Sequence, residues 1–371
     1  MNRRWQRLAL AVLAGAMLAG CSSAGYYWQS LRGHWALLHA ARPVSDWVAE
    51  AQTPPPLRER LALALRVRRF ASSALALPDN ASYTRYAQLK RSAAVWNVVA
   101  APPYSLSLYT WCFPITGCVG YRGYFDEADA RAEAARLAAS GLETSVYGVP
   151  AYSTLGYSNW LGGDPLLSTW ANWPEGDFVR LMLHELAHQK VYAAGDTAFN
   201  ESYATAVGRL GTRLWLSEHA DDAARAAHAA AGQRRAQWRE LTRKTRERLA
   251  HIYKQNSAPA QASPSLQAMK KEVFADFTAN YARLRAQWQA QGSSDAQLAA
   301  LDRWVREANN ASFAAQGAYD DLVPAFIALF QEQGRDWRRF HAAVAELAEL
   351  TRAERHARLQ ALLPLSRAAT Q

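Results

Sequence analysis

Apolar residues recur every three or four positions along most of the chain, which is the spacing that turns one side of a helix towards a core. Prolines and glycines separate these runs and mark where helices end. The pattern predicts a long helical tail over residues 218–362 and earlier helices over residues 30–50, 57–75, 126–140 and 178–216, the last divided by a turn.

Two stretches have a different pattern. Residues 94–112 are rich in β-branched and aromatic residues and are interrupted at Pro102 and Pro103, so they predict extended structure. Residues 143–158 predict a strand or a hairpin for the same reason. The second part of this segment, residues 149–158, is a candidate edge strand for an extended peptide, and an ordinary sheet strand is the alternative.

Short mixed segments followed by helices indicate an α+β fold. We expect residues 21–371 to form a single unit that is mixed α/β over residues 93–216 and helical over residues 217–371. The chain has 371 residues, half of which are hydrophobic, and this is ample for a sizeable core.

The first twenty residues predict an export signal. A basic start is followed by an apolar run over residues 8–18, which is too short to span a bilayer as a mature helix. The run ends in Leu-Ala-Gly-Cys, residues 18–21, which resembles the lipobox of bacterial lipoproteins, where the cysteine is acylated and becomes the new N-terminus. We therefore expect residues 1–20 to be removed and Cys21 to be lipidated. A plain signal peptide with an incidental cysteine is the alternative.

The expected partners follow from the anchor and the charge. Acyl chains on Cys21 would bind a membrane, because each buried methylene contributes about 0.8 kcal/mol. By resemblance to other lipoproteins, Ser22 after the cysteine favours the outer membrane, with the body of the protein facing the periplasm. The formal net charge is +10, which suits nearby anionic headgroups. Nucleic acid is not expected, because the longest basic stretch, residues 233–251, predicts a solvated helix face.

Cys112 and Cys118 are the two remaining cysteines. A disulfide is the natural interpretation in the oxidising periplasm. It would close a small loop that contains Pro114 and Gly117, which are both turn residues. A metal role is the alternative, but the two cysteines lack the companion ligands of a zinc ribbon.

The segment from Phe178 to Ala204 contains His184, Glu185 and His188. Residues four apart in a helix lie on the same face one turn along, so both imidazoles could bind one ion at about 2.0–2.1 Å. Glu185 would lie beside the ion and could take a proton from a water on it. This is the H-E-x-x-H arrangement of zinc peptidases. A polar helix face that binds no ion is the alternative.

A catalytic zinc has three protein ligands and one open position. We expect Gly195 to end the first helix, and Asp196 or Thr197 to cap a second one. Glu201 on the second helix would then return to the histidines, so it is the candidate third ligand, with a solvent-facing glutamate as the alternative. Two neighbours of this ligand could orient the site by hydrogen bonding, namely Asn200 and Thr205.

These residues resemble the gluzincin pattern, in which two histidines and a downstream glutamate hold zinc. Segments between Trp111 and Phe326, among them "WCFPITGCVGYRGYF", "LMLHELAHQKVY" and "GDTAFNESYA", resemble a family of bacterial lipoproteins described as putative zinc aminopeptidases. The resemblance implies a gluzincin-like core, one Zn²⁺ per chain and a peptide substrate. The stretch from His188 to Glu201 is shorter than in the best-known gluzincins, and Thr205 replaces the Asp that often follows the ligand.

The ligand set implies a mechanism. Zinc polarises a carbonyl and lowers the pKa of its water towards about 7, and Glu185 would pass the proton of that water to the leaving amine. The intermediate also needs a hydrogen-bond donor opposite the base. Tyr319 is the candidate donor, and Tyr192 and Tyr203 are its rivals.

The pattern predicts peptide hydrolysis but does not decide between aminopeptidase and endopeptidase action. Aminopeptidase action in the periplasm is the first hypothesis, and endopeptidase action on envelope proteins is the second. An aminopeptidase must bind a free α-ammonium, for which Asp164, Glu218 and Asp320 are candidate carboxylates. A non-catalytic envelope lipoprotein that binds a partner through the helical tail is the rival from another class.

Overall fold

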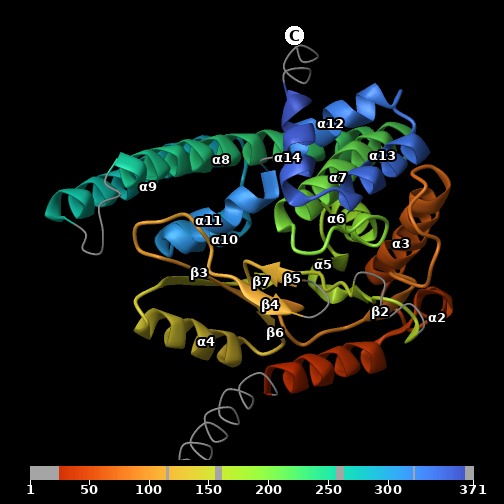
Figure 1. Cartoon of the computed structure of the whole chain (residues 1–371). Coiled ribbons are helices and arrows are strands. Elements are labelled where there is room, and N and C mark those ends of the chain that lie inside the picture. Colours follow the sequence, from red (N-terminus) through yellow and green to blue (C-terminus); the bar gives the residue numbers. More distant parts are fainter. Residues whose placement is uncertain (1–24, 114–116, 155–160, 256–262, 321, 364–371) are drawn as a thin grey trace, which may run out of the picture.

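The computed structural model describes residues 25–113, 117–154, 161–255, 263–320 and 322–363. These residues form long helices around two three-stranded sheets and one two-stranded sheet (Figure 1). The mixed α+β composition and the predominance of helices towards the C-terminus are as the sequence predicts. The predicted signal segment and Cys21 lie outside the described residues, and so does Ser22.

The first helix expected from the sequence is divided in two. Residues 25–40 are helical, β1 (Arg42–Pro43) follows them, and α2 (Val44–Ala49) begins immediately after β1. Pro43 accounts for the division, because proline inside a helix removes a hydrogen-bond donor and clashes with the preceding turn.

β1 instead becomes the edge of a small sheet. It pairs antiparallel with β2 (Arg85–Ala87), and β2 pairs parallel with β8 (Leu166–Leu167). Between β1 and β2 lies α3 (Pro55–Ser73), which confirms the helix expected over residues 57–75.

A second sheet has the strand order β6-β3-β7. Its central strand is β3 (Val95–Ala101), and β6 (Arg122–Tyr124) and β7 (Glu143–Val149) pair antiparallel with it on either side. The strand expected over residues 143–158 therefore ends at Val149, and its residues 155–158 lie outside the described part.

Both faces of this sheet are covered, so every residue of β3 is buried. Side chains alternate between the two faces of a strand. Trp96, Val98 and Ala100 pack towards α4 (Glu127–Ala139), which confirms the helix expected over residues 126–140. Val99 and Ala101 pack on the other face against α11 (Asn310–Asp320).

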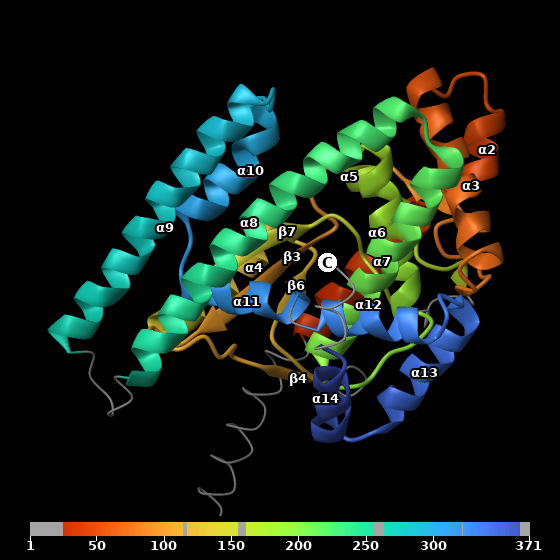
Figure 2. The same ribbon diagram turned by 90° about the horizontal axis from the view of Figure 1, so that it is seen from above.

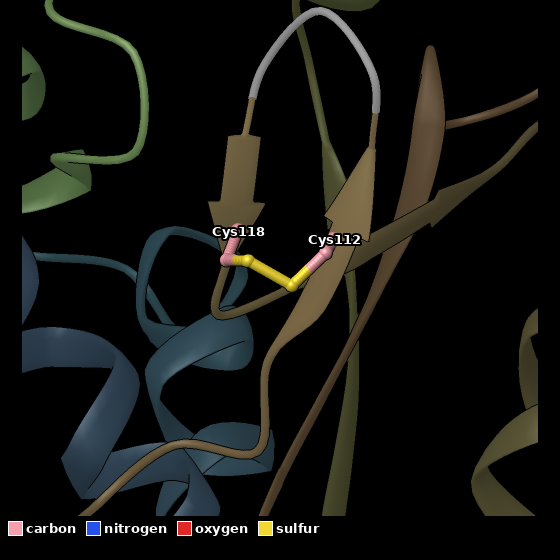
Figure 3. The surroundings of a disulfide bond; sticks show 2 residues. All are labelled: Cys112 and Cys118. Atoms are coloured by element: carbon pink, nitrogen blue, oxygen red, sulfur yellow. A yellow bond between two sulfur atoms is a disulfide. The ribbon is translucent and has the colours of Figure 1, made fainter.

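A small hairpin projects next to this sheet. β4 (Trp111–Phe113) pairs with β5 (Gly117–Val119), and the register places Cys112 directly opposite Cys118. The two cysteines form a disulfide across the hairpin, which is shown in Figure 3.

The rest of the chain is helical. α6 (Glu175–His188) and α7 (Thr197–His219) pack side by side, α8 (Asp222–Gln255) packs against both, and α9 (Pro264–Ala290) lies along the far side of α8 (Figure 2). Within the described residues, none of the helices combines the length and the apolar character needed to cross a bilayer. The shorter helices are α5 (Ser168–Ala171), α10 (Asp295–Arg306), α12 (Val323–Glu332), α13 (Trp337–Glu349) and α14 (Arg352–Ala361).

Candidate metal centre

α6 carries the two histidines. The helix follows Pro174 and has two acidic residues in its first turn, where they suit the positive end of the helix dipole. Its apolar residues enter the main core, while His184 and Glu185 lie on the opposite, mostly buried face. The fully buried residues of α6 that fix this orientation are Phe178, Val179, Met182, Leu183, Leu186 and Ala187.

α6 ends at His188, with Gln189 as its C-cap, so the expectation that Gly195 ends the helix is wrong. The side-chain amide of Gln189 donates to Asp164 Oδ2 at 3.3 Å and to Ser82 Oγ at 3.2 Å. These long-range bonds hold the end of the helix in a buried polar group that the local sequence does not reveal. Gly195 lies seven residues after His188 and has a φ of +76°, a conformation that glycine adopts without strain.

The turn between α6 and α7 is held by two side chains. Asp196 caps α7, and its Oδ1 accepts from the backbone N–H of Phe199 at 3.2 Å, as the sequence predicts. Asn200 bonds to both backbone groups of Ala193, because its Nδ2 donates to the carbonyl and its Oδ1 accepts from the N–H, both at 2.8 Å. The expected role for Asn200 is therefore more specific than orienting a ligand, since it closes the turn that returns the chain to the histidines.

α7 brings Glu201 to the histidines. The Oε2 atom of Glu201 lies 3.3 Å from His184 Nε2 and 3.7 Å from His188 Nε2. The two Nε2 atoms are 3.1 Å apart, and the three ligand atoms form a group that could hold a metal ion. Thr205 lies one helical turn after Glu201, on the same half-exposed face of α7.

The spacing of these atoms fits a zinc ion. Ligand atoms about 2.0–2.1 Å from zinc at tetrahedral angles lie about 3.3–3.4 Å from one another. The observed separations of 3.1, 3.3 and 3.7 Å bracket that value. Two imidazoles and one carboxylate are also a donor set that catalytic zinc sites use, with a fourth position open to water or substrate.

The ionisable groups of the cluster stabilise one another's charged forms. Burial alone would raise the pKa of Glu201, but the two imidazoles outweigh this effect and hold the pKa well below its usual range. Burial would lower the pKa of His188, but Glu201 and then Glu185 raise it. The pKa of Glu185 is raised, chiefly by burial, which suits a group that must accept a proton and release it again.

A family model described as "Putative aminopeptidase" matches residues 25–359. The chain belongs to this family. No curated protein and no solved structure matches the chain. The family match spans the metal cluster, the disulfide hairpin and nearly all of the helical tail, and it supports a peptidase function in general.

In this aminopeptidase-family protein, two candidates from the sequence lie away from the cluster: Tyr203, a rival for the hydrogen-bond donor, and Glu218, a carboxylate for the α-ammonium. Tyr203 is fully buried on the core side of α7, where its hydroxyl bonds to His341 Nδ1 at 2.8 Å. Glu218 is half-exposed near the end of α7, and seventeen residues of helix separate it from Glu201 by about 26 Å. Neither side chain is placed to contact a substrate bound at the cluster.

The remaining candidates from the sequence are Asp164, Tyr319 and Asp320. Asp164 is fully buried, and its carboxylate accepts from Thr154 Oγ1 at 2.7 Å as well as from Gln189, so it holds the end of α6. Tyr319 and Asp320 belong to α11, but their side chains lie outside what the structure describes.

The structure adds Tyr121, which the sequence analysis does not single out. Burial raises the pKa of Tyr121 well above its usual value, and the charges of Glu201 and Glu185 raise it further. The phenol therefore stays protonated and can donate a hydrogen bond. Tyr121 lies in "WCFPITGCVGYRGYF", a segment that carries the family resemblance, but nothing in that pattern indicates that the charges of Glu185 and Glu201 act on it.

The disulfide hairpin, which precedes Tyr121 in the chain, packs against the turn between α6 and α7. Gly117 in β5 packs against the turn after α6, where a Cβ on Gly117 would lie 2.9 Å from the backbone nitrogen of Gly195. Only glycine permits this approach, and its φ of +71° favours glycine as well. The hairpin and the turn are thus in direct contact.

Proposed function

We propose that this protein is a zinc-dependent aminopeptidase. One observation carries the proposal: two consecutive helices of an aminopeptidase-family chain bring His184, His188 and Glu201 to one point, with Glu185 beside them. The separations of the ligand atoms match those of a tetrahedral zinc site.

The residues of the cluster would share the chemistry. His184, His188 and Glu201 would hold the zinc, which when bound polarises the scissile carbonyl and makes water a better nucleophile. Glu185 accepts a proton from the attacking water and delivers it to the leaving amine. Tyr121 replaces Tyr319 as the first candidate for the donor that stabilises the developing negative charge on the carbonyl oxygen.

The proposed location is the periplasmic side of the outer membrane, with the chain anchored through an acylated Cys21. The lipobox resemblance of residues 18–21 supports this location. The disulfide between Cys112 and Cys118 suits an oxidising compartment.

Three single variants test the function. Glu185→Gln should keep one zinc per chain and lose kcat by about 10²–10⁴-fold, because it removes the base and no ligand. Glu201→Gln should lose the metal. Glu218→Gln, on the same helix, should change neither metal content nor turnover.

Metal content is measured by elemental analysis, and turnover is measured on an unblocked peptide and its N-acetylated counterpart. An aminopeptidase cleaves only the unblocked peptide, and an endopeptidase cleaves both. Wild-type protein without stoichiometric metal, or full turnover in Glu185→Gln, would refute the proposal.

A further inference from the structure

The helical segment of residues 25–40 carries a row of exposed apolar side chains. Tyr27, Trp28, Leu31 and Trp35 are 48%, 67%, 50% and 48% exposed. Tyr109 is the only other large hydrophobic residue with comparable exposure among the residues that the structure describes. We call these four side chains the aromatic stripe.

The aromatic stripe occupies one side of the helix. Successive residues in an α-helix are about 100° apart, so all four side chains fall within an arc of about 100°. A compact apolar arc of this kind in water marks an interaction surface, whereas single exposed apolar residues need no explanation.

The opposite side of the same helix is firmly attached to the body of the protein. The ring of Tyr26 packs on Phe113 and Tyr124 at 5.6 Å each. Gln29 Oε1 accepts from the backbone N–H of Phe125 at 3.1 Å. Gly33 lets the helix approach, since a Cβ there would lie 2.1 Å from Phe125 Cγ. The stripe is therefore presented by a fixed helix, and its direction relative to the sheet is set by these contacts.

Length and composition indicate a lipid surface as the partner. Five residues lie between Cys21 and Tyr27, so the two positions are six steps apart and at most about 20 Å from each other. An acylated Cys21 would therefore hold the stripe within reach of the bilayer. Trp and Tyr are the residues that favour the membrane–water interface, and Arg32 is exposed on the same helix, where it can meet anionic headgroups.

We infer that the aromatic stripe inserts into the headgroup region of the membrane and fixes the orientation of the whole enzyme on it. This inference rests on the proposed lipidation of Cys21, not on the proposed hydrolysis. The helix lies on the opposite side of the β6-β3-β7 sheet from α12, α13 and α14 (Figures 1 and 2). The C-terminal helices would then face away from the bilayer.

The test uses the full acylated chain, reconstituted into vesicles of phosphatidylethanolamine and phosphatidylglycerol whose acyl chains carry bromine. Bromine quenches only tryptophans that reach the bilayer. Bromine should quench part of the tryptophan fluorescence of the wild type. The double variant Trp28→Ser/Trp35→Ser should show no quenching, so its fluorescence should be the same in brominated and unbrominated vesicles. Tyr109→Ser, which changes an exposed aromatic residue elsewhere, should behave like the wild type.

Two results would overturn the inference. One is equal quenching in the wild type and the double variant. The other is a dimer in detergent that the double variant dissociates, because the stripe would then bind a second copy of the chain. Mass spectrometry of the N-terminus tests the anchor separately. Quenching in a chain whose Cys21 is not acylated would support insertion of the stripe and refute the lipidation.

Discussion

The side chain of Asn200 bonds to both the N–H and the C=O of Ala193, at 2.8 Å each. Ala193 belongs to the turn that follows α6, and Asn200 immediately precedes the candidate ligand Glu201. This pair of bonds closes the connection, so that the short linker returns the glutamate to the histidines.

Asn200→Ala should therefore loosen the metal site. The Ala193 carbonyl also accepts from the backbone N–H of Asp196 at 3.3 Å, so only the Ala193 N–H loses its partner. A buried donor left without a partner costs about 1–3 kcal/mol, and the free energy of unfolding should fall by about that amount. Zinc affinity should fall by about 10–100-fold, as is typical when a group that positions ligands is lost. Urea unfolding and competition with a chelator measure the two effects, and Asn172→Ala, at an exposed position, is the control. Unchanged zinc affinity would contradict this role.

Arg355 should be essential for stability, because it links α14 to the start of α7. Its Nη1 lies 2.7 Å from Asp196 Oδ2, and both side chains are buried. Arg355→Leu leaves a buried carboxylate short of a partner and should cost about 3–5 kcal/mol. Arg352→Leu is the matched control: its guanidinium lies 4.0 Å from the same carboxylate, is 69% exposed, and should contribute less than about 1 kcal/mol. Equal denaturation midpoints for the two variants would be the adverse result.

Tyr121→Phe should reduce kcat and leave metal binding intact. Removal of one hydrogen-bond donor to the developing charge costs about 10²–10³-fold in kcat. Steady-state kinetics and zinc analysis on the same preparation separate the two effects. Tyr109→Phe is the control because that ring is exposed. If Tyr192→Phe lowers kcat and Tyr121→Phe does not, the donor is Tyr192.

His341 should make the fold less stable in mild acid. It is buried between Tyr203, whose hydroxyl donates to Nδ1, and the Leu75 carbonyl, which accepts from Nε2 at 2.9 Å. Burial lowers the pKa of His341 from 6.5 to about 4. As the pH falls from about 6.5 to 4, the unfolded chain therefore takes up a proton that the folded chain does not, and the folded state loses stability.

The loss due to His341 should reach about 2 kcal/mol at pH 5. Urea unfolding at pH 7.5 and pH 5 should thus show a drop that is smaller by this amount in His341→Gln. His39→Gln, at an exposed position, should leave the drop unchanged. A drop of the same size in wild type and His341→Gln would show that other groups cause the acid sensitivity.

Local pattern predicts several elements closely, and its failures have identifiable causes. The helix expected over residues 126–140 appears as Glu127–Ala139, because its cap and its alanine spacing act within the segment itself. The helix expected over residues 30–50 is divided at Pro43, which pairs in a sheet with Arg85, 42 residues later. Gly195 does not end α6, because distant partners hold Gln189 at the end of the helix.

The sequence by itself determined the features that arise within one element: the shared face of His184 and His188, the place of Glu185 beside them, and the cap at Asp196. Helix geometry relates residues four apart in the same way in any fold. Only the tertiary structure decided that Glu201 meets the histidines, that the hairpin at Gly117 packs on the turn at Gly195, and that Arg355 secures α7 from 159 residues away. These contacts join separate elements, and their distances depend on how the whole core packs.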